Sequence, residues 1–310
     1  MGANVFPAIE IGGSHVSTAR VDLDARQIVP GTHRRMPLNS NGTVDEIIGE
    51  IAACARRSVG PEREAWGVAI PGGFDFDRGI GSFAGAGKFE ALDGVPLRPL
   101  LVRALEPTPL EIAFVNDADA FLLGEWLGGA ASGERLAVGI TLGTGIGSAF
   151  VEDGAIVDDD PRVPPQGRVD LLTIDGRPLE DTISHRAIVA RYAARAKEAP
   201  PATGVDEIAT RARTGEPAAV EALDGAFEAL GRTLAPWLRR FGAEVLVVGG
   251  GMMGAWDVIE PPLQRGLAAA DADAGAAIAV MASTRIEESA LVGAAHRARI
   301  RATTAAERAR

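Results

Sequence analysis

Hydrophobic positions along the chain follow two alternating patterns, which predict strands and helices in turn. Val5–Ile11 and Ala65–Ile70 are short, nearly continuous apolar runs with the length of buried strands. Between them, Thr43–Ser58 places apolar residues three and four positions apart, which predicts an amphipathic helix capped by Thr43. Alternating strands and helices are typical of layered α/β proteins.

The opening of the chain is repeated in its second half. Val5–Ile11, two glycines and a second strand at Val16–Val21 form a hairpin signal. The same order of strand, glycine turn and strand returns at Leu136–Leu142 and Ser148–Val151. This period is too long for a solenoid repeat, so the pattern predicts two domains of similar construction, for which 310 residues suffice.

The rest of the chain continues the alternation. We expect further strands at Arg26–Pro37, Ile112–Val115, Glu244–Val248 and Ala277–Ala282. We expect helices at Val95–Leu105, Ala118–Gly128, Leu179–Ala199, Val205–Thr214, Glu216–Phe241 and Ala290–Ile300, and another ending at Leu267. Phe74–Leu92 is expected to form a long glycine-rich loop and Asp158–Pro178 an irregular stretch, and Pro236 is expected to kink its helix.

Composition and charge narrow the class of protein. Apolar residues make up 46% and charged residues 24% of the chain, as in ordinary soluble globular proteins. The net charge of −11 gives no general attraction to phosphate backbones, so we expect no nucleic-acid partner. No apolar run approaches the ~18–20 residues of a membrane helix, and the N-terminus lacks a signal-peptide pattern. We therefore expect a cytoplasmic protein with no membrane partner.

The chain has a single cysteine, Cys54. One cysteine excludes an intramolecular disulfide and any Cys-rich zinc site. Because Cys54 lies in an apolar-periodic segment, we expect it in the core.

Three glycine-rich turns are candidates for binding a nucleotide. Two of them lie between strands, where backbone amides can approach phosphate oxygens closely, and neither contains the lysine of a Walker loop. The third follows a buried strand, and its flat surface could admit an adenine or a ribose. Each turn taken alone is also compatible with a plain hairpin or a strand-to-helix connection. The residues concerned are Gly12, Gly13, Ser14, Gly143, Thr144, Gly145, Gly147, Gly249, Gly250 and Gly251.

Two carboxylates lie beside these features. Asn116 and Asp117 end an apolar strand, the position at which open α/β sheets bind ligands. An aspartate there can accept a proton from a hydroxyl nucleophile, or it can simply cap the next helix. Glu10 precedes the first glycine turn and could hold Mg²⁺ through water.

Taken in order, these motifs resemble the ROK family (repressors, open reading frames and sugar kinases). The matching segments are 9–14, 70–73, 115–118, 142–147, 247–251 and 289–295, and they span nearly the whole chain. The resemblance implies an actin-like ATPase (ribonuclease H-like) α/β fold, with two domains around a cleft. It places a sugar- and phosphate-binding domain at 1–116, completed by the C-terminal helix near 290–310, and a nucleotide-binding domain at 117–289.

The resemblance also implies an activity, in which the γ-phosphate of Mg-ATP passes to a sugar hydroxyl, by analogy the 6-hydroxyl. Asp117 would be the base, Asn116 a sugar ligand, and Gly72 and Gly73 part of the substrate site. The two hairpin turns would hold the phosphates and Gly249–Gly251 the adenosine. Family repressors carry an N-terminal DNA-binding domain, which is disfavoured here because the first strand begins so early. A homodimer is expected.

Several positions depart from the family pattern. Arg168 stands where many members have a sugar-binding glutamate, Leu171 where they have a histidine, and Lys88 where they have an asparagine. The cysteines of the family's zinc site are absent, so no zinc is expected. His185 replaces a glycine and is expected to line the pocket, whereas Glu180 matches a family carboxylate that reaches the sugar.

These substitutions imply a changed ligand, because unpaired polar groups in a pocket cost about 1–3 kcal/mol each. Arg168 and Lys88 could meet an acidic or strongly polar group. Alternatively, Asp170 and Glu90 could neutralise them or bind a substrate amine, or Arg168 could lie on a solvated loop. The sequence thus predicts a kinase of a hexose, an amino sugar or a sugar-like cyclitol, with glucose still possible. The alternative is a catalytically silent sugar-binding or regulatory protein.

Overall fold

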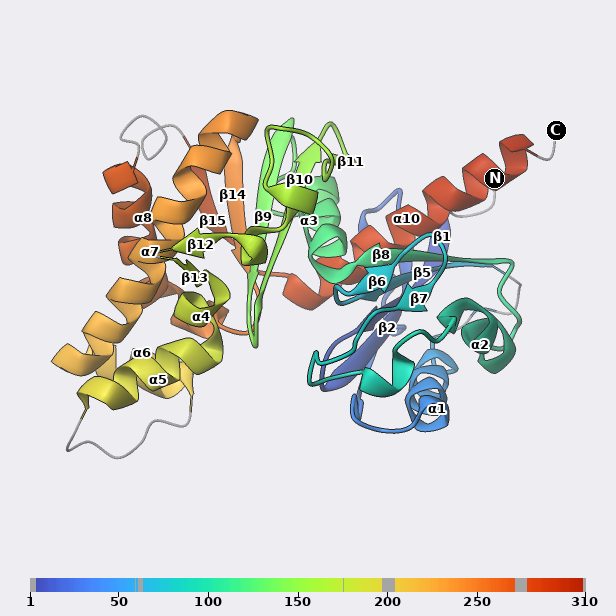
Figure 1. Cartoon of the computed structure of the whole chain (residues 1–310). Helices are drawn as coiled ribbons and strands as arrows, with labels where there is room; N and C mark the ends of the chain where they lie inside the picture. The colour runs from blue at the N-terminus through green and yellow to red at the C-terminus, as the bar shows by residue number, and fades with distance from the viewer. Residues whose placement is uncertain are drawn as a thin grey trace. The chain divides into compact units, whose positions relative to one another are not determined.

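The chain forms two compact units in the computed structural model, which describes residues 4–58, 60, 64–174, 176–196, 204–270 and 278–308. Unit 1 comprises Met1–Gly129 and Arg285–Arg310, and unit 2 comprises Ala130–Thr284 (Figure 1). The last segment of the chain therefore returns to the first unit. Each unit is a mixed α/β structure with its own sheet and its own hydrophobic core.

Unit 1 is built on a six-stranded sheet with the order β3-β2-β1-β5-β8, in which β4 also pairs with β2. Its strands are β1 (Val5–Ile11), β2 (His15–Asp22), β3 (Gln27–Ile28), β4 (Arg34–Pro37), β5 (Ala65–Ile70) and β8 (Glu111–Asn116). β1 and β2 form the predicted antiparallel hairpin, whereas β1, β5 and β8 run parallel. The carboxyl ends of these three strands therefore meet at one edge of the sheet.

Helices cover both faces of this sheet. On one face, α1 (Val44–Ala55) and α2 (Leu97–Ala104) share a hydrophobic core with Trp66 and Val68 of β5. Successive residues of a strand point to opposite faces, so Gly67 faces the other side. There α10 (Ile286–Arg308) packs against β1, β5, β8 and α3 (Asp117–Gly128), and Figure 1 shows it in red along the sheet.

The packing of α10 requires glycines. A Cβ atom at Gly67 would lie 1.9 Å from the carbonyl oxygen of Ala294, and one at Gly124 would lie 1.9 Å from that of Ser289. These distances are far below any van der Waals contact, so α10 can approach β5 and α3 only because both positions lack a side chain. α3 therefore belongs to unit 1, and the division of the chain falls after Gly129 rather than after residue 116.

Unit 2 repeats the plan with a five-stranded sheet of order β11-β10-β9-β14-β15. Its strands are β9 (Leu136–Leu142), β10 (Ile146–Glu152), β11 (Ala155–Ile156), β14 (Val245–Gly249) and β15 (Ala279–Ala282). Its helices are α4 (Glu180–Ile183), α5 (His185–Arg195), α6 (Val205–Arg213), α7 (Pro217–Phe241) and α8 (Trp256–Ala270). A hairpin of β9 and β10 followed by the parallel strand β14 matches β1, β2 and β5 in unit 1, which confirms the predicted repeat.

The segments predicted to be loops contain short elements. The stretch after β5 holds β6 (Phe74–Asp75), β7 (Ile80–Gly81) and the 3-10 helix η1 (Glu90–Leu92). The irregular stretch of unit 2 holds η2 (Pro165–Gly167), η3 (Val169–Leu171), β12 (Thr173–Ile174) and β13 (Arg177–Pro178), and η4 (Met253–Ala255) precedes α8.

Most predicted elements have close to the observed bounds, and β1, β5 and β9 match residue for residue. The expected helix at Leu179–Ala199 is instead two helices, because the Ser184 side chain accepts a hydrogen bond from the Ala187 N–H and starts α5; residues 197–199 lie outside the described ranges. The expected start of the last strand, Ala277, also lies outside them. α7 continues through Pro236.

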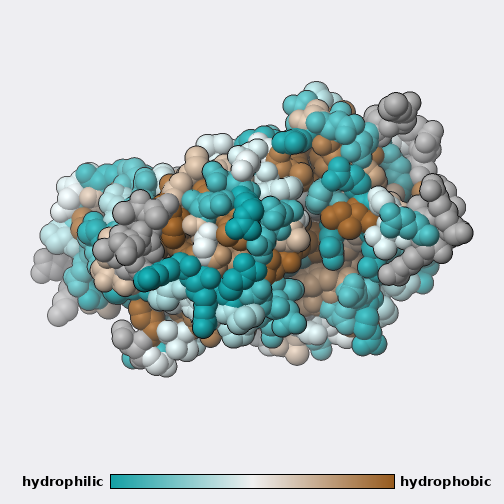
Figure 2. All heavy atoms as spheres, turned by 90° about the horizontal axis from the view of Figure 1, so that it is seen from above, coloured by the Kyte–Doolittle hydropathy of each residue, from teal (hydrophilic) through white to brown (hydrophobic). Residues whose placement is uncertain are grey.

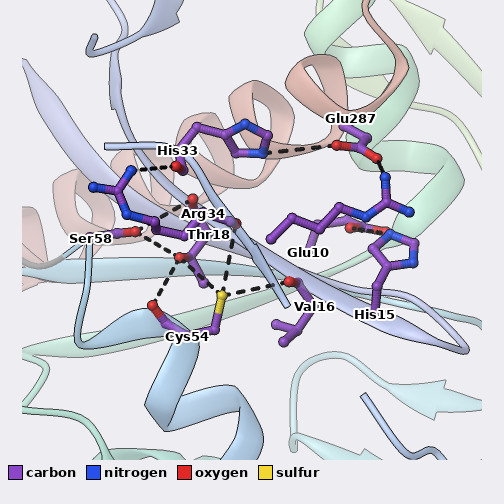
Figure 3. A network of polar contacts seen from close by, with 10 residues as sticks. Glu10, His15, Val16, Thr18, His33, Arg34, Cys54, Ser58 and Glu287 are labelled. Atoms are coloured by element: carbon purple, nitrogen blue, oxygen red, sulfur yellow. Dashed lines mark hydrogen bonds and ion pairs between the residues drawn. The ribbon is translucent and has the colours of Figure 1, made fainter. Parts of the chain in front are cut away.

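Cys54 is fully buried in unit 1, as predicted, with its Sγ 3.6 Å from the Thr18 hydroxyl (Figure 3). On the face shown in Figure 2, hydrophilic side chains predominate and are interrupted by smaller hydrophobic patches. Within the described ranges, no helix is both long enough and apolar enough to cross a membrane.

Candidate active site

The edge where β1, β5 and β8 end in unit 1 gathers several of the predicted site residues. In the strand register, Glu10 lies beside Ala69, and Ile70 lies beside Asn116. The chain then turns at Gly72, whose Cβ position would be 3.7 Å from the Nδ2 atom of Asn116. Gly73 adopts a φ of +81°, a left-handed conformation that favours glycine. These residues therefore form one neighbourhood, as open α/β sheets predict.

Asn116 caps the helix that follows the last of these strands. Its Oδ1 accepts hydrogen bonds from the N–H groups of Ala118 at 2.9 Å and Asp119 at 3.3 Å. Asp117 is the first residue of α3, and its Oδ1 also accepts from the Ala118 N–H at 2.9 Å. The main capping role therefore belongs to Asn116. The Oδ2 atom of Asp117 is not used in the cap and can take other partners.

The surroundings of Asp117 favour proton uptake. Burial raises the pKa of its carboxyl, although part of the side chain is accessible to solvent. The positive charge of Lys88 and the Ala118 N–H lower this pKa, and the negative charge of Glu10 raises it again. The net effect is a raised pKa. A carboxylate with a raised pKa accepts a proton more readily than an ordinary surface aspartate, which suits a general base.

The first glycine turn follows β1, the strand whose Glu10 acts on the pKa of this carboxyl. The Gly12 N–H donates to the carbonyl oxygen of His15 at 2.9 Å, and Gly13 and Ser14 are exposed. A Cβ atom at Gly13 would lie 3.5 Å from the Cδ of Lys88, so the stem of that side chain lies beside the turn. The turn is thus open toward solvent and has a cationic side chain beside it, an arrangement that can receive an anion.

Glu10 contacts a histidine that the sequence analysis did not single out. Its Oε2 lies 3.3 Å from the Nε2 of His15 (Figure 3). A Cβ atom at Gly12 would lie 2.7 Å from the Cε1 of His15, so the imidazole occupies the space that Gly12 leaves. His15 follows the glycine turn directly, but no hydrophobic period or motif spacing marks it.

In unit 2 the second and third glycine turns lie together. The Gly143 N–H donates to the carbonyl oxygen of Gly145 at 3.0 Å, which closes the turn between β9 and β10. Gly250 has a φ of +98°, and a Cβ atom there would lie 2.3 Å from the carbonyl oxygen of Leu142. The glycines after β14 therefore pack against the end of β9. Nothing lies within 4 Å of the Cβ positions of Gly143 and Gly251, so both are open.

Glu180 lies on the Gly143–Gly147 turn. A Cβ atom at Gly145 would be 2.8 Å from the Oε1 of Glu180. The charge of Glu180 also contributes to raising the pKa of Arg168, behind the hydrogen bonds and charge of Asp170. Glu180, Arg168 and Asp170 are therefore near one another in unit 2, together with the glycine turn.

Arg168 is paired with Asp170. Its Nε donates to Oδ1 at 3.1 Å and its Nη2 to Oδ2 at 2.5 Å, so the neutralised alternative is the one found. The Ser148 hydroxyl donates to the Gly167 carbonyl at 2.7 Å and accepts from the Val169 N–H at 2.9 Å, which holds this loop on β10. Among the described residues, no ion pair joins Lys88 to Glu90. The Oε1 of Glu90 accepts a hydrogen bond from the Gly87 N–H at 3.3 Å.

The side chain of His185 contacts the N-terminus of α6. Its Nε2 accepts a hydrogen bond from the Val205 N–H at 3.4 Å, at the beginning of α6. A Cβ atom at Gly204 would lie 3.2 Å from the same nitrogen. The imidazole therefore has a structural partner, and its expected place in a sugar pocket stays a prediction.

A sequence model of the ROK family matches residues 6–158 and 175–300. The chain belongs to the ROK family. A glucokinase of Thermotoga maritima is 26% identical over 277 residues, which cover 83% of this chain and 84% of that protein. An N-acetyl-D-glucosamine kinase of Pectobacterium atrosepticum is 25% identical over 268 residues, which cover 80% and 84%.

Solved structures agree with this assignment. The ROK family glucokinase from Streptomyces griseus, in complex with glucose and AMPPNP, superposes with a TM-score of 0.74 at 23% identity, covering 96% of this chain and 99% of that chain. The ROK sugar kinases have the actin-like ATPase fold, and this member shares it. The predicted family and fold class are therefore confirmed.

Glu10 fits a role toward Mg²⁺ in this ROK protein. Its Oε2 is buried and, within the part of the chain that the structure describes, accepts no hydrogen bond, although the Nε2 of His15 lies 3.3 Å away. Such an oxygen suits a hard cation held largely by nucleotide phosphates and water. Among the same residues, no group of three or more His, Cys, Asp or Glu side chains is arranged to hold a metal by itself. The expected absence of zinc stays a prediction.

Proposed function

We propose that the protein is an ATP-dependent sugar kinase in which Asp117 is the general base. The observation that carries this proposal is the environment of the Asp117 carboxylate. Burial raises its pKa, and the charge of Lys88, whose stem contacts the open Gly12–Ser14 turn, acts on it. The curated relatives named glucokinase and N-acetyl-D-glucosamine kinase support a sugar hydroxyl as acceptor. The acceptor is a hexose, an amino sugar or a sugar-like cyclitol, phosphorylated at the hydroxyl that corresponds to the 6-position.

In the reaction, the acceptor hydroxyl gives its proton to Asp117 while its oxygen bonds to the γ-phosphorus of ATP. Catalysis of this transfer consists mainly of positioning and electrostatic stabilisation. The amides of Gly12–Ser14 receive the transferring phosphoryl group, and the turns at Gly143–Gly147 and Gly249–Gly251 bind the nucleotide. Mg²⁺, with Glu10 as a ligand through water, would neutralise phosphate charge when bound.

The acceptor contacts follow from the remaining predicted residues. Asn116 offers its Nδ2, because its Oδ1 is engaged by α3, and Gly72 allows an acceptor to approach that amide. The carboxylates of Asp170 and Glu180 accept hydrogen bonds from acceptor hydroxyls or from an amine. The chemistry of this set favours polyhydroxylated or amino-bearing acceptors over acidic ones, since Arg168 is already neutralised by Asp170.

The experiment is an ATP-consumption assay with a panel of hexoses, amino sugars and cyclitols. Asp117→Asn is compared with Asp119→Asn, which removes a carboxylate from the same first turn of α3. We expect Asp117→Asn to lower kcat by roughly 10²–10⁴-fold, the usual contribution of a general base. Asp119→Asn should stay within a few fold of wild type. Full activity of Asp117→Asn would refute the assigned base.

A catalytically silent sugar-binding protein is the second candidate. It is favoured by Leu171, which stands at the family's histidine position and is 47% exposed, and by the engagement of Arg168 with Asp170. Calorimetric binding of a panel member without any ATP consumption would select this candidate over the kinase. We further propose a cytoplasmic homodimer, for which light scattering in solution measures the mass.

A further inference from the structure

We propose that Lys88 is a catalytic residue of the phosphoryl transfer, whose ammonium contacts the transferring phosphoryl group beside Asp117. The inference rests on the proposed function and assigns Lys88 to the reacting group instead of to recognition of the acceptor. Three features of the described structure carry it: the path of the side chain, the charges around Asp117 and the backbone that holds Lys88.

The side chain of Lys88 lies beside the turn proposed to receive the phosphoryl group. Its Cδ lies 3.5 Å from the position that a Cβ of Gly13 would occupy, which is ordinary van der Waals contact. The stem of Lys88 therefore passes beside the turn at contact distance. A cation at this place adds a full charge to the partial charges of the turn amides.

The charge of Lys88 also reaches Asp117. After burial, it is the strongest influence on the pKa of that carboxyl, and it opposes the negative charge of Glu10. Two carboxylates at one sheet edge would repel an incoming phosphoryl group, which is itself negatively charged. Lys88 supplies the compensating positive charge where the phosphoryl group and the carboxylate come together.

The backbone around Lys88 is held in an uncommon conformation. Gly87 has a φ of +70° and Phe89 a φ of +59°, so left-handed residues flank Lys88 on both sides. For Phe89 this conformation is unfavourable, and it persists because the ring is fully buried and the N–H donates to the Ser40 carbonyl at 2.8 Å. Local strain of this kind is often found at functional sites, where it fixes the direction of a side chain.

The choice of lysine is also informative. Of the 31 Lys and Arg residues in the chain, all but Lys88 and Lys197 are arginines. A guanidinium beside Asp117 would favour a planar bidentate pair with that carboxylate and would hinder its action as a base. A compact ammonium can contact phosphoryl oxygens and leave Asp117 free to accept a proton.

The step balances as follows. The acceptor hydroxyl transfers its proton to Asp117, and its oxygen forms a new bond to the γ-phosphorus. The bond from that phosphorus to the β–γ bridging oxygen breaks, and its electron pair leaves on ADP. Lys88 keeps its proton throughout and contributes only positive charge toward the phosphoryl oxygens.

The kinetic test uses Lys88→Met, which keeps the stem and removes the charge, and Lys88→Arg, which keeps the charge. Lys197→Met is the matched control at the other lysine of the sequence. With the acceptor that the wild type phosphorylates, Lys88→Met should lower kcat by about 10²–10³-fold. The KM for the acceptor should change by less than about threefold, since the lost interaction is made in the transition state. Lys88→Arg should recover part of kcat, and Lys197→Met should match wild type.

A pH profile separates this role from a merely structural one. Because Lys88 lowers the pKa of Asp117, Lys88→Met should move the acidic limb of kcat/KM to higher pH, with Glu10 and the Ala118 N–H still acting on Asp117. Lys88→Arg, which keeps the positive charge, should not move the limb to higher pH. A rise in acceptor KM at unchanged kcat would overturn the proposal. So would an unshifted acidic limb in Lys88→Met.

A chemical test does not require turnover. Acetic anhydride labels lysine amines, and peptide mass spectrometry follows Lys88 with Lys197 as the internal reference. We expect Mg-AMPPNP to slow labelling of Lys88 severalfold relative to Lys197, because the bound phosphates cover the amine. If the wild type phosphorylates no acceptor, the proposed function fails, whereas this measurement still reports whether Lys88 contacts the nucleotide phosphates. Labelling of Lys88 that is unchanged by Mg-AMPPNP would overturn the proposal.

Discussion

The guanidinium of Arg168 and the carboxylate of Asp170 form a two-point pair, with Nε to Oδ1 at 3.1 Å and Nη2 to Oδ2 at 2.5 Å. The hydrogen bonds of Asp170 raise the pKa of Arg168 further, and the charge of Glu180 adds to this. Arg168 thus neutralises a carboxylate of its own unit. The arginine that replaces the family's glutamate at position 168 therefore has its own carboxylate partner, Asp170.

The strength of this pair can be measured with a double-mutant cycle. We expect Arg168→Gln and Asp170→Asn to be coupled by about 0.5–1 kcal/mol in urea unfolding, because the side chains are 44% and 18% exposed. Asp181→Asn combined with Arg168→Gln provides the uncoupled control. A cycle with no coupling would show that the two side chains do not act as a pair in solution.

Asp117 should reduce stability at neutral pH. Burial raises its pKa, so the folded protein binds the proton more tightly than the unfolded chain, and the contribution of Asp117 to stability falls as the pH rises from about 4 through the raised pKa. Asp117→Asn should therefore raise Tm at pH 7. The gain should shrink toward pH 4, where wild-type Asp117 is also neutral when folded.

Thermal unfolding of wild type and Asp117→Asn between pH 4 and pH 8 measures this effect. A gain of about 1 kcal/mol corresponds to roughly 2–4 °C in Tm for a domain of 150–250 residues. Asp159→Asn, at an exposed position of unit 2, is the control and should show no gain that grows with pH. A Tm of Asp117→Asn equal to or below that of wild type at pH 7 contradicts the prediction.

Gly67 should be intolerant of even one methyl group. Its Cβ would lie 1.9 Å from the backbone of α10, so Gly67→Ala must push the helix away from β5 and should cost about 3 kcal/mol. Gly49 is a solvent-exposed residue in the middle of α1, and nothing lies within 4 Å of its Cβ position. Gly49→Ala should therefore stabilise the fold by about 0.5–1 kcal/mol. Urea unfolding compares the two, and similar stabilities for both variants would mean that α10 does not pack closely in solution.

Much of the fold follows from local sequence because the apolar runs end at glycines. β1 and β9 have the predicted bounds since each run is closed by a glycine turn. The break at Ser184 was not predicted, because apolar residues on both sides continue a helical spacing and the cap depends on one side-chain hydrogen bond. The division after Gly129 depends on the contact of α3 with α10, which pairs segments more than 150 residues apart.

The site is predictable only in part. Position at a strand end marked Asp117, and glycine pairs marked the turns. The influence of Lys88 on Asp117 acts between segments far apart in the sequence, so no local pattern displays it. The contact of Glu10 with His15 arises from the tight turn at Gly12, and the residue type at 15 gives no signal of it.

Because α10 belongs to unit 1, the ribosome synthesises all of unit 2 before unit 1 is complete. Residues 130–284, which form unit 2, emerge before residues 285–308, which complete unit 1. Until α10 is released, the face of β5 that contains Gly67 lacks its covering helix. The second unit can therefore fold first, while this face of the first unit's sheet stays uncovered until α10 emerges.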